Sequence, residues 1–234
     1  GSTKNLNPPG TVIFVNCPFP TLDEDAAEAI SLEIGPHCKT PYNAPSFFNI
    51  SAMSYGALSK HAIKALSKGA KMANCWLNTG EGGLSRHHLS GGADIVFQIG
   101  TAKYGVRDQE GNLSDKKLKE VASHDQVKMF ELKMSQGAKP GKGGILPAIK
   151  VTEENSKIRG IQEGEASISP NRHPEINNIK EMLDVINHIR DVTGKPVGFK
   201  AVVGACGWIE EMCEEITKRG IESAPDFFAV DSGD

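Results

Sequence analysis

Two lysines of this 234-residue chain lie in apolar surroundings, where a positive charge is costly. Lys200 lies inside the segment VGFKAVV, and Lys133 lies between apolar neighbours in ELKMSQ. A buried ammonium group loses much of its hydration free energy unless an anion meets it. These residues therefore predict contact with an anionic substrate or cofactor. For Lys200, an internal ion pair with Glu81 or Asp231 is the alternative.

The segment ELKMSQGAKPGKGG, residues 131–144, combines lysine and glutamine with several glycines and a proline. This composition excludes a helix interior or a regular strand and predicts a shaped loop. Lysine supplies a compact charge for carboxylates, and glycine lets backbone N–H groups approach a ligand. We expect Lys133, Gln136 and Lys139 to meet anionic groups. A solvated linker would also fit the composition, with Lys139 and Lys142 as surface charges.

Other residues with chemical potential carry weaker signals. Ser54 in AMSYG resembles part of a nucleophile elbow, but the first glycine of G-x-S-x-G is missing, so a hydrolase is disfavoured. Glu81 in TGEGG could position a substrate or only brace its loop. His87 and His88 are adjacent and lack a third ligand at a usual spacing, so we predict no metal site and assign these histidines and His173 structural roles.

Composition excludes several classes of protein. The formal net charge of −3 gives no overall basic field, which disfavours a nucleic-acid-binding protein. No secretory signal opens the chain, and no apolar run approaches the roughly 20 residues needed to span a bilayer. We therefore expect a cytoplasmic protein without membrane contact. The cysteines stand at wide spacings without a C-x-x-C pair, which is typical of reduced thiols: Cys17, Cys38, Cys75, Cys206 and Cys213.

Strands and helices alternate along the chain, which predicts an α/β protein with a parallel sheet. Apolar runs rich in branched or aromatic residues predict the strands, and apolar residues at helical spacing predict the helices. The expected strands are SFFNISAM (46–53), CWLNTG (75–80), DIVFQIG (94–100), VGFKAVVG (197–204) and PDFFAVDSG (225–233). The expected helices are 59–73 behind Ser59, 114–131 behind Ser114, 178–194 ending at Gly194, and 208–220.

Polar residues at the carboxyl ends of the expected strands favour a closed barrel. In an eight-fold barrel these ends converge on one mouth, where the active site lies. No G-x-G-x-x-G follows the first strand, as an open nucleotide-binding sheet would require. The polar residues are Ser51, Ser54, Asn78 to Glu81, Gln98, Lys200 and Asp231 to Asp234. We predict a (β/α)8 TIM-type barrel over residues 46–234, preceded by an extended N-terminal arm over residues 1–45.

Six ordered blocks carry a family resemblance: SAMSYGALS (51–59), NTGEGG (78–83), QIGTAKYGV (98–106), ELKMSQGAKPGKGGILP (131–147), SISPNRHPEI (167–176) and VGFKAVVG (197–204). Together they resemble the FMN-binding synthase domain of glutamate synthases and of shorter glutamate-synthase-like proteins. The resemblance extends from about Pro45 to the end of the chain. Any single block, such as GEGG, would be a weak signal.

The resemblance implies a flavin site. By this resemblance Lys200 would face the N1 and C2-oxygen edge of FMN and stabilise the reduced ring, and Gln98 would hydrogen-bond its polar edge. The backbone of Ala52, Met53 and Ser54 would pack against the ring. The burial argument for Lys200 and the resemblance therefore agree.

The resemblance also implies a substrate site. The loop that contains Lys133, Gln136 and Lys139 would cross the mouth beside the flavin and 2-oxoglutarate, and these side chains would hold carboxylates. Glu81 would position the imino substrate or a catalytic water. With Lys200, Glu81 and Lys133 are the expected catalytic residues.

The implied activity is that of an FMN-dependent flavoprotein oxidoreductase of glutamate biosynthesis. It would reduce 2-iminoglutarate, formed from 2-oxoglutarate and ammonia, to L-glutamate. An electron-donor protein or an amidotransferase would be the partner. Two alternatives are an FMN barrel acting on another 2-oxo or 2-hydroxy acid, and a non-catalytic fragment without FMN.

The chain stops at Asp234, after about five of the eight strands of a barrel. In the family the flavin-phosphate segments and the cysteines of an iron-sulfur cluster lie beyond this point. We therefore expect little or no bound FMN in this chain alone. We also expect another copy, another chain or the arm to cover the edge strand FFAV, because a bare apolar strand self-associates.

Overall fold

The computed structural model describes residues 18–25, 31–137, 141, 143–204 and 207–231. The chain divides into two compact units, residues 1–30 and residues 31–234. The described part of the first unit contains one short 3-10 helix, η1 (Asp23–Asp25). The elements that position the candidate site all belong to the second unit.

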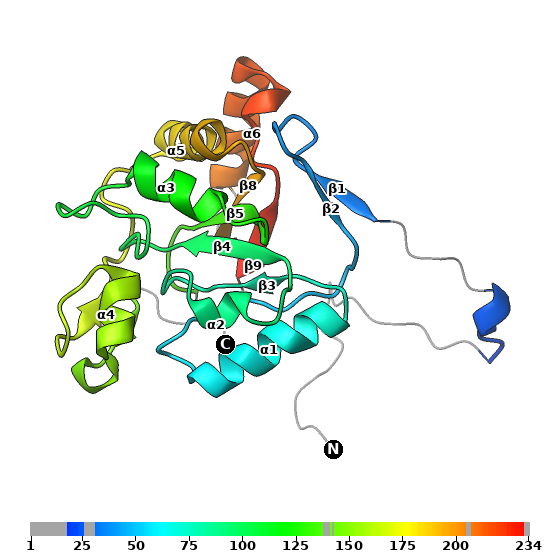
Figure 1. The fold of residues 1–234 in the computed structure, drawn as a ribbon. Helices are drawn as coiled ribbons and strands as arrows, with labels where there is room; N and C mark the ends of the chain where they lie inside the picture. The colour runs from blue at the N-terminus through cyan, green and yellow to red at the C-terminus, as the bar shows by residue number, and fades with distance from the viewer. Residues whose placement is uncertain (1–17, 26–30, 138–140, 142, 205–206, 232–234) are drawn as a thin grey trace, which may run out of the picture. The chain divides into compact units, whose positions relative to one another are not determined.

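The second unit contains a five-stranded parallel sheet in the order β3-β4-β5-β8-β9 (Figure 1). The strands are β3 (Leu77–Asn78), β4 (Ile95–Ile99), β5 (Val127–Lys133), β8 (Val197–Val202) and β9 (Phe228–Asp231). Helices flank the curled sheet, so the fold is a partial TIM-type barrel, as the sequence predicts. β9 lies at one edge of the sheet, and the expectation that another chain covers it stays a prediction.

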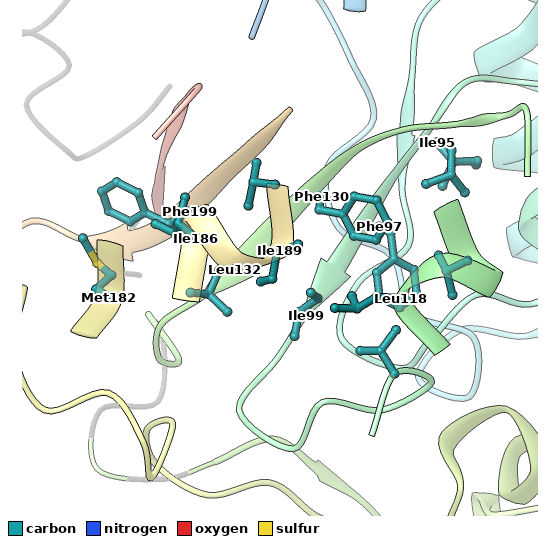
Figure 2. Packing of buried hydrophobic residues seen from close by; sticks show 14 of the residues in the cluster. Ile95, Phe97, Ile99, Leu118, Phe130, Leu132, Met182, Ile186, Ile189 and Phe199 are labelled. Atoms are coloured by element: carbon teal, nitrogen blue, oxygen red, sulfur yellow. The ribbon is translucent and has the colours of Figure 1, made fainter. Parts of the chain in front are cut away.

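One face of the sheet packs against helices. They are α1 (Lys60–Met72), α3 (Asp115–Ala122), α5 (Ile179–Thr193) and α6 (Gly207–Arg219). Alternate strand residues, including Phe97, Phe130 and Phe199, join the buried helix residues in one apolar core (Figure 2). The rings of Phe97 and Phe130 lie 5.7 Å apart. The two-residue period of the strands thus commits one face to the core and leaves the other face for the site.

A short hairpin packs against the opposite, inner face of the sheet. It pairs β1 (Leu32–Ile34) with β2 (Tyr42–Ala44) in antiparallel register. Ile34, Tyr42 and Ala44 form a second apolar cluster with Val96 and Met129 of the sheet. The hairpin therefore covers apolar positions of β4 and β5 that the outer helices do not reach.

Shorter elements stand in the connections that follow the strands. Helix α2 (Arg86–Leu89) lies between β3 and β4. Between β5 and α5 come β6 (Ile145–Leu146), η2 (Ala148–Lys150), α4 (Glu153–Arg159) and β7 (Ser167–Ile168), and β6 pairs with β7 in antiparallel register. The 3-10 helix η3 (Ile221–Ser223) precedes β9.

The expected helix caps are present. Ser59 accepts a hydrogen bond from the N–H of Ala62 at the start of α1, and Ser114 accepts one from the N–H of Lys117 at the start of α3. Helix α5 ends at Gly194, whose φ of 71° is left-handed. These local signals confirm the predicted starts of α1 and α3 and the predicted end of α5.

Two expectations about local structure are wrong. The predicted helix over residues 114–131 ends at Ala122, and Val127–Lys133 form strand β5. Residues 46–53 do not form a buried strand, because only Ile50 makes a parallel bridge, to Leu77. Phe47 and Phe48 are 65% and 82% exposed. Both errors come from apolar residues whose tertiary position overrides a local pattern.

Two isoleucine-to-alanine substitutions, one in the core and one at the surface, should differ greatly in their effect on the free energy of unfolding. Ile186→Ala, at a fully buried position, should lower the free energy of unfolding by about 2 to 5 kcal/mol because it removes buried methyl groups and leaves a cavity. Ile149→Ala, at a side chain that is 93% exposed, should change it by less than about 0.5 kcal/mol. Urea unfolding measures both variants, and equal effects would contradict the assigned core.

Candidate functional site

The inner face of the sheet becomes polar toward the carboxyl ends of its strands. The register places Gln98 of β4 opposite Glu131 of β5, and Lys133 of β5 opposite Lys200 of β8. A pocket of about 410 Å³ opens beside this row. Its polar wall contains Asn78, Glu131, Lys200 and Asp231. Polar side chains from β3, β5, β8 and β9 therefore line one space at one end of the sheet.

A buried carboxylate, that of Glu131, organises the centre of this row. The side chain is 5% exposed. Its Oε1 accepts hydrogen bonds from Asn78 Nδ2 at 2.9 Å and from Gln98 Nε2 at 2.6 Å. Asn78 Oδ1 in turn accepts from the N–H of Gly80 at 3.0 Å. The two amides and the carboxylate therefore fix one another across three strands.

Glu131 was not among the residues assigned a role from the sequence. An acidic residue in the apolar stretch VKMFELK is the signal that could have revealed it. The mistaken helix over residues 114–131 hid this signal, because a glutamate at the end of a helix would be solvated.

Lys133, Gln136 and Glu81 form a closed triangle of contacts. Lys133 Nζ lies 3.3 Å from Glu81 Oε2 and donates to Gln136 Oε1 at 2.7 Å. Gln136 Nε2 donates to the same Glu81 oxygen at 2.8 Å. The side chains of Lys133 and Glu81 are 13% and 18% exposed, so the pair is only partly screened by water. Three predicted site residues are thus brought together, while Lys139 lies outside the described residues.

Two glycines enclose Glu81. A Cβ atom added to Gly100 would lie 2.6 Å from the Cβ of Glu81, and one added to Gly144 would overlap the Glu81 carboxylate. Gly144 belongs to the glycine-rich loop, which then runs into strand β6. Glycine is therefore required at position 144, where the loop passes the Glu81 carboxylate.

Lys200 pairs with a carboxylate of the neighbouring strand. Its Nζ lies 3.1 Å from Asp231 Oδ1, and the two side chains are 16% and 20% exposed. The sequence analysis gave an internal ion pair with Glu81 or Asp231 as the alternative to contact with a ligand, and the structure contains the pair with Asp231. Because Lys200 and Asp231 also line the 410 Å³ pocket, the pair faces the space where a ligand would lie.

The segment that contains Ala52, Met53 and Ser54 lies beside the end of β3. The Met53 N–H donates to Asn78 O at 3.1 Å. Gly80, with a φ of 64°, passes so close that an added Cβ would lie 2.7 Å from the backbone nitrogen of Ser54. All three residues are partly buried, so this segment forms one rim of the mouth.

Arg159 is a buried cation that the sequence analysis missed. It is 5% exposed, donates to Ser167 Oγ at 3.2 Å and lies 5.1 Å from the Tyr104 ring centre. Burial lowers the pKa of its guanidinium, although Tyr104 and Glu81 act in the opposite direction. Among the described residues no carboxylate pairs with Arg159, and its buried Nε has no hydrogen-bond partner. No local motif marks this arginine in the sequence.

His173 lies behind Lys133. Its Nε2 donates to the Lys133 carbonyl at 2.9 Å, and the ring is 1% exposed. Glu175, next but one along the chain, pairs with the buried Lys103 at 3.0 Å. These contacts hold the end of β5 in place, which fits the structural role expected for His173.

The adjacent histidines point to different partners. His88 Nε2 donates to Met53 O at 2.8 Å, and its Nδ1 accepts from Ser85. His87 Nε2 lies 3.2 Å from Glu154 Oε1. In the described part of the chain, no three side chains of His, Cys, Asp or Glu are grouped as a metal site would require.

The sequence pattern described as "Conserved region in glutamate synthase" matches residues 13–231. The chain belongs to the glutamate synthase family. All six blocks that carried the resemblance lie within the matched residues, so the family assignment from the sequence is confirmed.

Two similar proteins are longer than this chain. The chain is 45% identical over 203 residues to the glutamate synthase large subunit-like protein YerD of Bacillus subtilis (strain 168). These aligned residues cover 86% of this chain and 38% of YerD. It is 35% identical over 180 residues to the archaeal-type glutamate synthase [NADPH] of Thermotoga maritima, covering 76% of this chain and 32% of that protein. The chain thus spans less than two-fifths of either relative's length.

A further relative is the archaeal glutamate synthase [NADPH] of Methanocaldococcus jannaschii. The two are 36% identical over 153 residues, which cover 64% of this chain and 28% of that protein.

Within the described residues of this glutamate synthase family member, no helix has the length and apolar character that a membrane span requires.

The buried His88 predicts a loss of stability in mild acid. Burial lowers its pKa in the folded state below the ordinary value of 6.5, so the unfolded state binds more protons below that pH. The free energy of unfolding should therefore fall as the pH drops from about 7.5 to about 5.5. His88→Gln should make this dependence shallower, and His173, whose pKa burial also lowers, should supply part of the remaining slope.

Urea titrations across this pH range measure the effect. The matched control is His37→Gln, at an exposed histidine in the turn that follows β1. It should leave the pH dependence as in the parent chain. An identical slope in the parent and in His88→Gln would contradict the assignment.

Proposed function

We propose that this chain forms part of an FMN-dependent oxidoreductase of glutamate synthase type. The reaction would reduce 2-iminoglutarate, formed from 2-oxoglutarate and ammonia, to L-glutamate. The observation that supports it most is the convergence of Glu81, Lys133 and Gln136 at the carboxyl end of the sheet in a member of this family. A barrel of this kind carries its active site at that end.

The residues around the 410 Å³ pocket fit the polar edge of a flavin. That edge presents carbonyl oxygens and ring nitrogens, and the pocket offers the ammonium of Lys200 and the amide of Asn78. The amide of Gln98 lies beside it, hydrogen-bonded to Glu131, which lines the pocket. When bound, FMN would supply the hydride for the reduction. Lys200 would lie against the ring edge on which negative charge develops, while Asp231 orients Lys200 through their ion pair. Ala52, Met53 and Ser54 would form the rim against the ring.

The cations at the mouth suit a dicarboxylate substrate. Lys133 supplies a compact charge beside Gln136, and Arg159 supplies a planar guanidinium whose Nε has no partner among the described residues. A guanidinium binds a carboxylate through two parallel hydrogen bonds. We assign Lys133, Gln136 and Arg159 to the substrate carboxylates, and Lys139 to the same group of contacts.

Glu81 is suited to the imino nitrogen. Its carboxylate forms one corner of the triangle, where contacts with Lys133 and Gln136 orient it. A carboxylate in this position would accept a hydrogen bond from an iminium N–H and so align the carbon atom that receives the hydride. Shortening this side chain would withdraw that contact.

The proposed reaction needs a source of electrons and a source of ammonia. The names of two relatives specify NADPH. We propose an electron-donor protein and an amidotransferase as the partners that would deliver electrons and ammonia to this chain.

The reaction is tested by product analysis on protein extended to the length of its relatives, supplied with FMN, a reductant, 2-oxoglutarate and ¹⁵N-ammonia. We expect ¹⁵N-labelled L-glutamate. In the same assay Lys133→Met should raise the KM for 2-oxoglutarate about ten-fold or more, because a charge-assisted contact is worth roughly 1.5 to 3 kcal/mol.

Lys157→Met is the control for this assay, since Lys157 is 74% exposed and pairs only with Glu153 among the described residues. It should leave the KM unchanged. Turnover of other 2-oxo acids without formation of glutamate would favour the alternative of a flavin barrel with a different substrate.

Two opposite substitutions test the role of Lys200. Lys200→Met should lower the flavin reduction potential, because a positive charge near the ring stabilises its reduced anion. Asp231→Asn should raise it, because it removes the carboxylate that partly neutralises Lys200. Redox titration of the flavin-loaded extended protein measures both, and an unchanged potential in Lys200→Met would remove Lys200 from the flavin site.

A further inference from the structure

A second pocket, of about 350 Å³, lies between the start of α1 and the short helix α2. Its lining residues are Lys60, His61, Lys64, Arg86, His87 and Ser90. None of the residues assigned above to flavin or substrate lines it. The pocket is therefore separate from the mouth, and no step of the proposed reaction uses it.

This basic pocket carries excess positive charge. Lys60 and Lys64 are one helical turn apart on α1, so their side chains lie on the same face. Neither has an acidic partner among the described residues, whereas Arg86 pairs through Nε with Glu154 at 2.8 Å. Three basic side chains thus stand against one carboxylate. Like charges one turn apart destabilise a helix slightly, and a bound anion would reverse this effect.

The position of α1 strengthens the attraction for an anion. The helix has 13 residues, and its first two, Lys60 and His61, line the basic pocket. The amino end of a helix carries partial positive charge and free N–H groups. The helix end and the lysine side chains therefore act on the same space.

One ring nitrogen of His87, a residue that lines the pocket, lacks a hydrogen-bond partner among the described residues. The His87 ring is 2% exposed, and its Nε2 lies 3.2 Å from Glu154 Oε1. The Tyr55 ring packs edge-on at 4.7 Å and fixes the imidazole. The other ring nitrogen, Nδ1, is buried without a hydrogen-bond partner among the described residues. Such atoms are rare in folded proteins and call for a ligand or a water.

We propose that the basic pocket binds a small phosphate-bearing anion. Lys60, Lys64 and Arg86 would pair with phosphate oxygens, and His87 Nδ1 would bond to one oxygen or its hydroxyl. A hydrogen phosphate group can both donate and accept, so it satisfies this nitrogen in either tautomer. A concave site of this volume holds a small molecule, whereas an acidic protein would need a broad, flat surface.

Calorimetric titration of the 234-residue chain at low ionic strength tests the proposal. The probes are pyrophosphate, inorganic phosphate and glycerol 3-phosphate, with citrate as an anion that lacks phosphate. We expect saturable one-to-one binding of at least one phosphate probe and much weaker binding of citrate. Binding of citrate as tight as that of every phosphate probe would overturn the assignment of the ligand class.

A matched pair of double variants locates the site. Lys60→Gln with Lys64→Gln should weaken the binding about ten-fold or more, because two charge-assisted contacts are lost. Lys68→Gln with Lys71→Gln removes the same charge from exposed positions of α1 that do not line the basic pocket. It should change the affinity by less than about two-fold. Equal weakening in both double variants, or no saturable binding to the parent chain, would overturn the proposal.

A spectroscopic measurement on the parent chain is independent of any substitution. The imidazole ¹⁵N signals of His87 should shift as pyrophosphate is added, with the dissociation constant found by calorimetry. The signals of His124, which does not line the basic pocket, should stay in place. An unmoved His87 at saturation would show that the anion binds elsewhere and would contradict the proposal.

Discussion

The two-residue period of the central parallel strands is the constraint on which the site depends. In β5 the side chains of Phe130 and Leu132 enter the outer core, so those of Glu131 and Lys133 must face inward. The parallel register then places Gln98 and Lys200 beside them. A shift of the register by one residue would bury the charges under the helices and expose the aromatic rings. The apolar core and the polar mouth therefore specify each other.

Two cations of the mouth are held in ion pairs. Lys133 has Glu81, and Lys200 has Asp231. Partly buried ion pairs are weak evidence for stability, because the cost of desolvation offsets much of their attraction. Their value here is geometric, since each pair holds a cation at a defined point of a hollow. Arg159 differs, because it is buried without a carboxylate partner among the described residues. A substrate carboxylate would complete that arrangement.

The sequence predicted the elements whose local signals agree with their tertiary position. The caps at Ser59 and Gly194 mark helix ends that the structure contains, and the alternation of strands and helices led to the partial barrel. The run after Ala122 was misassigned, because helical spacing of apolar residues continues by chance into β5. Glu131 was missed with it, because a glutamate at the end of a helix would be solvated. Arg159 was missed for a different reason. Its burial arises from contacts with segments distant in the chain, such as Tyr104, that no local pattern contains.

The close fit of Glu81 between Gly100 and Gly144 has an evolutionary consequence. Three segments distant in sequence meet at this side chain, and at Gly100 and Gly144 the fit requires the absence of a Cβ atom. A methyl group at position 144 would displace the carboxylate, and a shorter acid at position 81 could accommodate it. A methyl group at position 100 would meet the Cβ of residue 81, which a shorter acid also carries. The effects of substitutions at these positions should therefore depend strongly on one another. A single substitution at one of these glycines would displace a side chain or make it overlap with another. Evolution at Gly100, Gly144 and Glu81 should therefore proceed mainly through coordinated substitutions.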